Sequence, residues 1–223
     1  MQSEEDSKIS YTRYLLWVVF TIISEKFEQL CIGPKGLRPF AVIIFIFISI
    51  FVLYTMFHRF QHEERMFSDS EQNLVASVTS HFGIVMFAVL AIGAFMLLIS
   101  YLKAKGGFPT LVTRVDYANR GAIAFWFDLI ATAGVISVEQ QFVSTGYFFN
   151  YFWSRSNGWN TLMGILISGL IFGLLNLNSF HLVNYFIYCA IGWVIATVYL
   201  ATQNFKISLM LGVFVGLLKV ILI

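Results

Sequence analysis

Long apolar runs dominate the chain and determine its predicted elements. They cover residues 39–57, 82–102, 121–138, 159–177, 182–200 and 205–223. A helix needs about 20 apolar residues to cross the hydrocarbon core of a bilayer, and these runs approach or reach that length. The runs are continuously apolar rather than alternating, which favours helices over the strands of a membrane barrel. The pattern therefore predicts an all-α fold, a polytopic bundle of about six or seven transmembrane helices.

The N-terminal stretch has a weaker apolar pattern. Residues 14–24 supply only about ten apolar positions before Glu25, Lys26 and Glu28, which is short for a span. Two placements stay open: a helix lying in the membrane interface, or the start of a longer, tilted span. We divide the chain into residues 1–38 with a cytoplasmic tail and this helix, residues 39–120 with two transmembrane helices, and residues 121–223 with a four-helix core.

Basic residues predict the orientation, because cytoplasmic loops carry an excess of Lys and Arg. With the Pro39 end inside, nine basic residues lie inside: Lys8, Arg13, Lys26, Lys35, Arg38, Lys103, Lys105, Arg114 and Arg120. Four lie outside, namely Arg59, Arg65, Arg155 and Lys206. A span over residues 14–31 would move only Lys8 and Arg13. We predict a multi-pass protein of the plasma membrane with a cytoplasmic N-terminal region.

Composition narrows the class of protein further. Hydrophobic residues make up 58% of the chain and charged residues 12%, with a mean hydropathy of +0.78. A soluble domain is about a quarter charged, so a soluble enzyme, a nucleic-acid-binding module and a disordered chain are all excluded. Cys31 and Cys189 do not form a disulfide framework, and no Cys/His cluster has zinc spacing. We predict no metal, no cofactor and no nucleic-acid partner, and the lipid bilayer as the surroundings.

Polar residues at membrane depth are the first candidates for function. Asp128 and Glu139 both fall on the third long run and are eleven residues apart, close to three helical turns. Two interpretations stay open. Both acids line one face toward the bundle interior, or one is a capped interior acid and the other lies at the water boundary. Polar residues then continue through Thr145 and reappear at Asn176. We therefore expect a buried site between the third and fourth spans.

Other residues receive structural interpretations. His58, His62 and His81 fall in or beside an external loop and are expected to face solvent, and His181 is expected at a span boundary. The pairs Gly169/Gly173 and Gly212/Gly216 have GxxxG spacing, which lets helix backbones approach closely. Packing within this protein is the expected use of both pairs, with a dimer interface as the alternative.

The C-terminal half resembles the CPBP intramembrane proteases, also called the CAAX-protease and bacteriocin-processing, or Abi, family. Members carry EExxxR followed by Gly and an aromatic or apolar residue, then FGxxH, then a T-x-N turn before a helix with HxxxN. Here the blocks read QQFVSTGY at residues 140–147, FGLLN at 172–176 and YLATQNFKIS at 199–208, followed by Gly212 and Gly216. Framework residues such as Gly146, Tyr147, Thr202 and Asn204 fit the pattern.

The positions that would carry chemistry differ from the family pattern. The resemblance implies that two glutamates and two histidines activate a water that attacks a peptide bond inside the membrane. Gln140 and Gln141 stand at the glutamate positions, and an amide cannot act as a general base. Asn176 replaces the first histidine and can form hydrogen bonds but cannot shuttle protons. Thr145, Gly212 and Gly216 replace the arginine, the second histidine and the asparagine.

We interpret the chain as a non-catalytic relative of these proteases, a pseudoprotease in a bacterial plasma membrane. It would bind another membrane or membrane-anchored protein, preferably of the cell envelope, and position or regulate it. The expected binding groove is lined by Glu139, Gln140, Gln141, Thr145, Phe172, Asn176 and Gly212. Alternatives are a divergent active protease using Glu139 with His181, a transport subunit, and a bacteriocin self-immunity protein.

Overall fold

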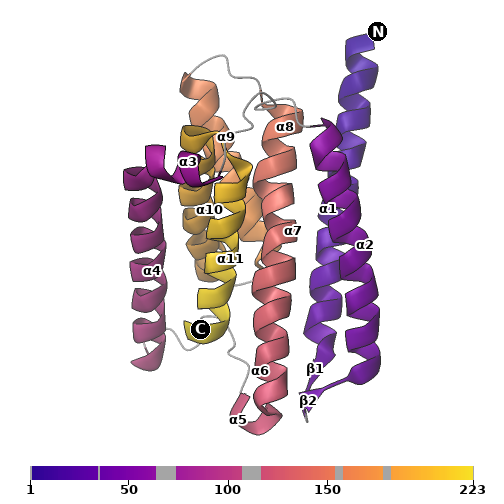
Figure 1. Cartoon of the computed structure of the whole chain (residues 1–223), viewed down its shortest axis with the longest axis vertical. Coiled ribbons are helices and arrows are strands. Elements are labelled where there is room, and N and C mark those ends of the chain that lie inside the picture. The colour runs from indigo at the N-terminus through magenta and orange to yellow at the C-terminus, as the bar shows by residue number, and fades with distance from the viewer. Residues whose placement is uncertain are drawn as a thin grey trace.

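The computed structural model describes residues 2–34, 36–63, 74–106, 117–153, 158–177 and 182–222. Within these ranges six helices are long and apolar enough to cross a membrane, which confirms the prediction of an all-α polytopic bundle (Figure 1). Helices of the N-terminal half are α1 (Gln2–Cys31), α2 (Pro39–Glu63), α3 (Leu74–Ser80) and α4 (Phe82–Ala104). Those of the C-terminal half are α5 (Tyr117–Arg120), α6 (Ala122–Leu129), α7 (Ser137–Gln141), α8 (Phe148–Phe152), α9 (Gly158–Leu175), α10 (Leu182–Thr202) and α11 (Phe205–Leu222).

The third span is longer than the sequence indicated. The predicted end at Val138 is wrong, because one helix runs over Ala122–Phe152. It includes two π-helical segments, η1 (Ile130–Ile136) and η2 (Phe142–Tyr147), on either side of α7. The polar residues that suggested a span end are buried against neighbouring helices instead of meeting water. Hydroxyl groups satisfy backbone carbonyls along this helix, with Ser137 donating to Thr132 O at 2.8 Å and Ser144 to Gln140 O at 2.7 Å.

Helix α1 packs along α2 and runs antiparallel to it, joined by a short hairpin of β1 (Ile32–Gly33) and β2 (Gly36–Leu37). Its outward side exposes apolar residues such as Leu15, Val19 and Ile22, while its inward side buries polar ones. This distribution suits a helix at membrane depth beside α2 and favours the second of the two placements left open by the sequence.

The course of α1 also changes the number of basic residues expected at each end of the bundle. The N-terminus lies at the opposite end of the bundle from the β1–β2 hairpin, which leads directly into Pro39 at the start of α2 (Figure 1). Lys8 and Arg13 therefore change ends, and the count of nine basic residues against four becomes seven against six. The Pro39 end and the N-terminus cannot both face the cytoplasm with α1 at this depth, so the basic residues no longer favour one orientation clearly.

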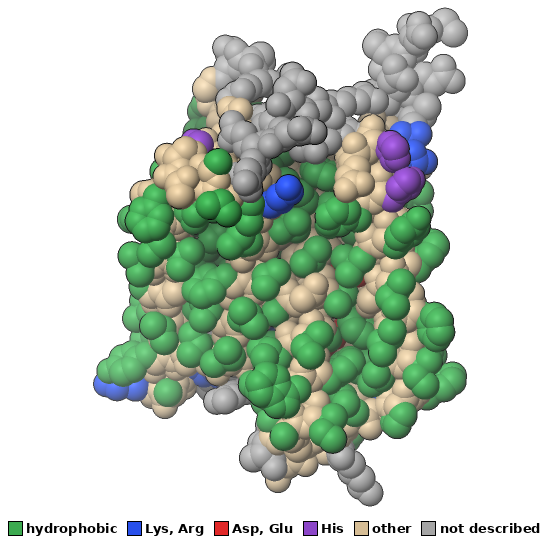
Figure 2. Space-filling view, in the orientation of Figure 1, with side chains coloured by type: hydrophobic (Ala, Val, Ile, Leu, Met, Phe, Trp, Pro, Cys, Tyr) green, Lys and Arg blue, Asp and Glu red, His purple; other side chains and the backbone are tan. Residues whose placement is uncertain are grey.

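The outer surface of the helices is apolar, and the interior holds carboxylates. Large side chains such as Phe40, Phe47 and Phe87 are exposed, and hydrophobic side chains cover the middle of the face in Figure 2. Asp128 and Glu139 are buried. A soluble protein has the opposite arrangement, so this distribution supports lipid contact around the bundle.

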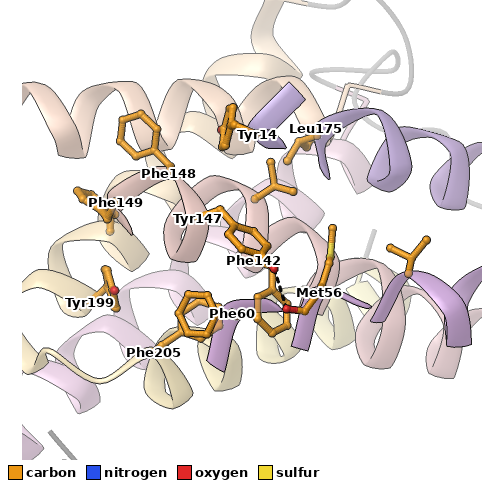
Figure 3. Close-up of a cluster of buried hydrophobic side chains, with 13 residues drawn as sticks. Tyr14, Met56, Phe60, Phe142, Tyr147, Phe148, Phe149, Leu175, Tyr199 and Phe205 are labelled. Carbon is orange, nitrogen blue, oxygen red and sulfur yellow. Dashed lines mark hydrogen bonds between the residues drawn. The ribbon is translucent and has the colours of Figure 1, made fainter. Parts of the chain in front are cut away.

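An aromatic cluster holds η2 against α2 and α11 (Figure 3). The Tyr147 hydroxyl donates to Met56 O at 2.7 Å, and Phe60 packs against Phe205 with ring centroids 4.6 Å apart. A Cβ on Gly146 would lie 3.0 Å from both of these phenylalanine rings. Two residues of the family framework, Gly146 and Tyr147, are thus packing residues here.

Both glycine pairs lie at close helix contacts within the chain. A Cβ on Gly169 would lie 2.8 Å from Cys189 O, and one on Gly173 would lie 3.0 Å from Tyr185 O, both on α10. A Cβ on Gly216 would lie 2.7 Å from Ala133 Cα. These glycines let α9 approach α10, and α11 approach η1, more closely than any larger residue would permit.

Candidate functional site

Two amide side chains join α7 to the end of α9. Gln140 Nε2 donates to Leu175 O at 3.2 Å, and Asn176 Nδ2 donates to Gln140 Oε1 at 3.0 Å. Asn176 Nδ2 also donates to Phe172 O at 3.0 Å. The structure therefore brings together the positions that correspond to a glutamate and to the first histidine of the family pattern, and both carry neutral amides.

Gln141 makes the same kind of connection to α11. Its Oε1 accepts hydrogen bonds from Thr145 at 3.1 Å and from Ser208 at 3.0 Å. A Cβ on Gly212 would lie 2.3 Å from Gln141 Cγ. The Gln141 side chain thus lies directly against the position that corresponds to the second family histidine, and it leaves no space there for even a methyl group.

The last framework element, the T-x-N turn, is a helix start. Gln203 has a φ of 53°, in the left-handed region. Asn204 Oδ1 then accepts a hydrogen bond from the backbone N–H of Lys206 at 3.0 Å, which caps the first turn of α11. This turn positions α11 so that Ser208 and Gly212 face Gln141.

Lys219 extends the polar network and was missed by the sequence analysis. Its Nζ donates to Asn176 Oδ1 at 3.2 Å and lies 5.4 Å from the centroid of the Tyr188 ring. It interacts electrostatically with Glu25 and with Asp128. The signal was a lysine well inside the last apolar run, far from Lys206 at its start, which should have been treated like the acids of the third run.

A second group of polar residues lies between α1 and the third span. Ser24 Oγ donates to Glu139 Oε1 at 3.2 Å, and the Glu28 side chain is in hydrogen-bond contact with Asp128. Asp128 also accepts from Thr132 at 3.0 Å and from the Tyr117 hydroxyl. Both acids of the third run therefore face α1, so Glu139 does not lie at a water boundary.

The acidic residues of α1 were read from the sequence only as a break in an apolar run. Thr21, Ser24, Glu25 and Glu28 are all buried, and their spacing of three and four residues places them on one face of a helix. That spacing was the available signal. It indicated a helix with an inward polar side, which composition alone did not show.

The expected groove is closed in this structure. Its predicted residues Glu139, Gln140, Gln141, Thr145, Phe172, Asn176 and Gly212 are all buried. Phe172 differs from the others because its side chain belongs to an apolar cluster with residues of α4, α10 and α11. Glu139 bonds to Ser24 of α1, and the other side chains bond or pack against one another, so these residues do not line an open groove in this structure.

The histidines that the structure describes lie away from this network. His58 and His62 are exposed on α2, with ring centroids 4.6 Å apart, and His81 precedes α4. His181 lies outside the described residues. In the part of the chain that the structure describes, no group of three or more His, Cys, Asp or Glu side chains is arranged to hold a metal ion.

The fold and the site together define a multi-pass membrane helix bundle with an internal polar network. Residues 122–217 match the family model described as type II CAAX prenyl endopeptidase Rce1-like. This match covers all three motif blocks and confirms the resemblance to the CAAX-protease family. Lys219 and the acids of α1 lie outside it. No curated protein and no solved structure matches the chain.

Proposed function

We propose that this chain is a non-catalytic relative of the CAAX-type membrane proteases and acts by binding a partner protein in the membrane. The observation that carries the proposal is the bonding of Gln140, Gln141 and Asn176. At the positions where the family pattern has glutamates and a histidine, these three neutral amides are buried. Gln140 and Asn176 bond to each other and to backbone carbonyls, and Gln141 accepts hydrogen bonds from the Thr145 and Ser208 hydroxyls.

Hydrolysis needs a group that accepts and returns a proton near the reacting bond. Gln140, Gln141 and Asn176 cannot do this, and Gln141 fills the space beside Gly212. Binding a helix in the membrane needs only shape and hydrogen-bonding groups. The substitutions therefore remove the side chains that cleavage requires. The helix arrangement and the apolar outer faces of the helices remain available for contact with a partner helix.

The first experiment tests cleavage. Purified full-length chain in proteoliposomes is incubated with a prenylated CAAX peptide and compared with the Glu139→Gln variant. We expect equal background product from both, because no side chain at the family positions is a competent base. Cleavage that depends on Glu139 would overturn the non-catalytic assignment and favour the divergent protease.

The second experiment tests binding. A photo-crosslinking residue is placed at exposed positions on different faces: Leu174 on α9, Phe186 on α10, Phe47 on α2 and Phe87 on α4. In native membranes we expect the same partner protein to crosslink from neighbouring positions and not from opposite faces. Crosslinks to lipid alone from all four positions would contradict the binding role, and the identity of the captured protein would separate an envelope partner from a bacteriocin.

A further inference from the structure

The charges inside the bundle do not balance. Glu25, Glu28, Asp128 and Glu139 are buried between α1 and the third span. Lys219 interacts electrostatically with the first three. Glu28 and Asp128 are in hydrogen-bond contact, which requires one proton between two carboxyl groups. Lys26, at the edge of this group, interacts with Glu25 as well. Two lysines and one shared proton therefore compensate three of the four carboxylates.

Glu139 is the carboxylate with the least compensation. It is 0% exposed, and its charged neighbour is Glu25, which has the same sign. Ser24 donates to Oε1 at 3.2 Å, and no described residue donates to Oε2. An ionised carboxylate without a counter-charge is very unfavourable in a membrane interior, so the charge of this group has to be neutralised.

A second unpartnered group lies on the same side of α1. Thr21 is 0% exposed and is one helical turn before Ser24. Among the residues that the structure describes, none forms a hydrogen bond with its hydroxyl oxygen. Hydroxyl and carboxylate oxygens are hard ligands, which suit small cations better than soft metals.

We propose that Glu139, Ser24 and Thr21 form an internal binding site for a small monovalent cation, a sodium ion or a proton, between α1 and α7. The cation neutralises Glu139 and thereby stabilises the docking of α1 onto the third span. This inference is independent of the proposed function, because it concerns the charge of the interior and not catalysis or a partner.

The test uses the purified full-length chain in detergent. Thermal unfolding is followed by tryptophan fluorescence, first with sodium chloride replacing N-methylglucamine chloride at constant ionic strength, then across pH in sodium-free buffer. A bound ligand in hundredfold excess over its dissociation constant raises Tm by about 5–10 °C for a chain of this size. A rise with sodium that Glu139→Gln removes identifies the ion, and a rise toward acidic pH without sodium that the same variant removes identifies the proton.

Two variants assign the effect to this site. Glu139→Gln removes the charge and should abolish the dependence on sodium and the part of the pH dependence that belongs to Glu139. The other charged or titratable groups nearby are the same in both proteins: Glu25, Lys26, Glu28, Asp128, Tyr188 and Lys219. Thr21→Val removes one oxygen with little change in shape and should weaken the dependence of Tm on the cation. This variant tests the site if Glu139→Gln does not fold.

The matched control is Thr55→Val on α2, where the hydroxyl bonds to backbone carbonyls of its own helix. This variant should respond to sodium and pH as the unchanged protein does. Equal responses from the unchanged protein and from Thr21→Val and Glu139→Gln would overturn the proposal. No response to sodium or to pH in the unchanged protein would also overturn it.

Discussion

Replacing Gly216 with alanine is the sharpest test of how α11 packs against the third span. The added Cβ would lie 2.3 Å from Ser137 Oγ and 2.7 Å from Ala133 Cα. Ser137 can rotate, but the backbone at Ala133 can yield only if η1 or α11 moves. Overpacking of this kind costs about 1–3 kcal/mol, which corresponds to a Tm about 2–12 °C lower for a chain of this length. Gly216→Leu should lower it further.

The matched control is Gly134→Ala on η1. Gly134 is exposed, and no described heavy atom outside its own helix lies within 4 Å of the added Cβ. Removing a helical glycine stabilises by about 0.5–1 kcal/mol, so this variant should unfold at or slightly above the temperature of the unchanged protein. Both proteins are unfolded in the same detergent and followed by tryptophan fluorescence. If Gly216→Ala unfolds no earlier than Gly134→Ala, then Gly216 does not lie at a tight crossing.

The other predictions concern the polar network. Gln140→Glu combined with Gln141→Glu should produce no cleavage of a prenylated CAAX peptide, because Asn176 still stands where a histidine is needed. The same pair should lower Tm, because it buries two carboxylates. Lys219→Met removes the donor to Asn176 and should cost about 1–3 kcal/mol. Adding Glu25→Gln to Lys219→Met should recover part of that loss in a double-mutant cycle.

The control for Lys219 is Lys206→Met, since Lys206 is an exposed lysine of the same helix. It should unfold like the unchanged protein. Additive effects of the Lys219 and Glu25 substitutions would show that these two groups do not interact. Cleavage by the double glutamate variant above the level of the unchanged chain would contradict the roles assigned to Asn176 and to both glutamines.

Much of the site followed from motif spacing. The three blocks predicted that residues 140–141, 176 and 212 belong together, and the bonds from Gln140 to Asn176 and from Gln141 to Ser208 join those same elements. The end of the third span could not be obtained in this way. Residues 139–147 are polar enough to suggest a water boundary, and only the neighbouring helices show that hydrogen bonds of Gln140 and Gln141 are made inside the bundle.

The sequence by itself determined that this is a helical membrane protein, because apolar runs of about 20 residues have no other stable structure in a bilayer. It also determined that the family positions carry neutral amides. Only the tertiary structure showed that α1 turns its polar side inward and that Lys219 meets Asn176. These contacts join residues at opposite ends of the chain, and the periodicity of one helix gives the direction of a face but does not identify its partner.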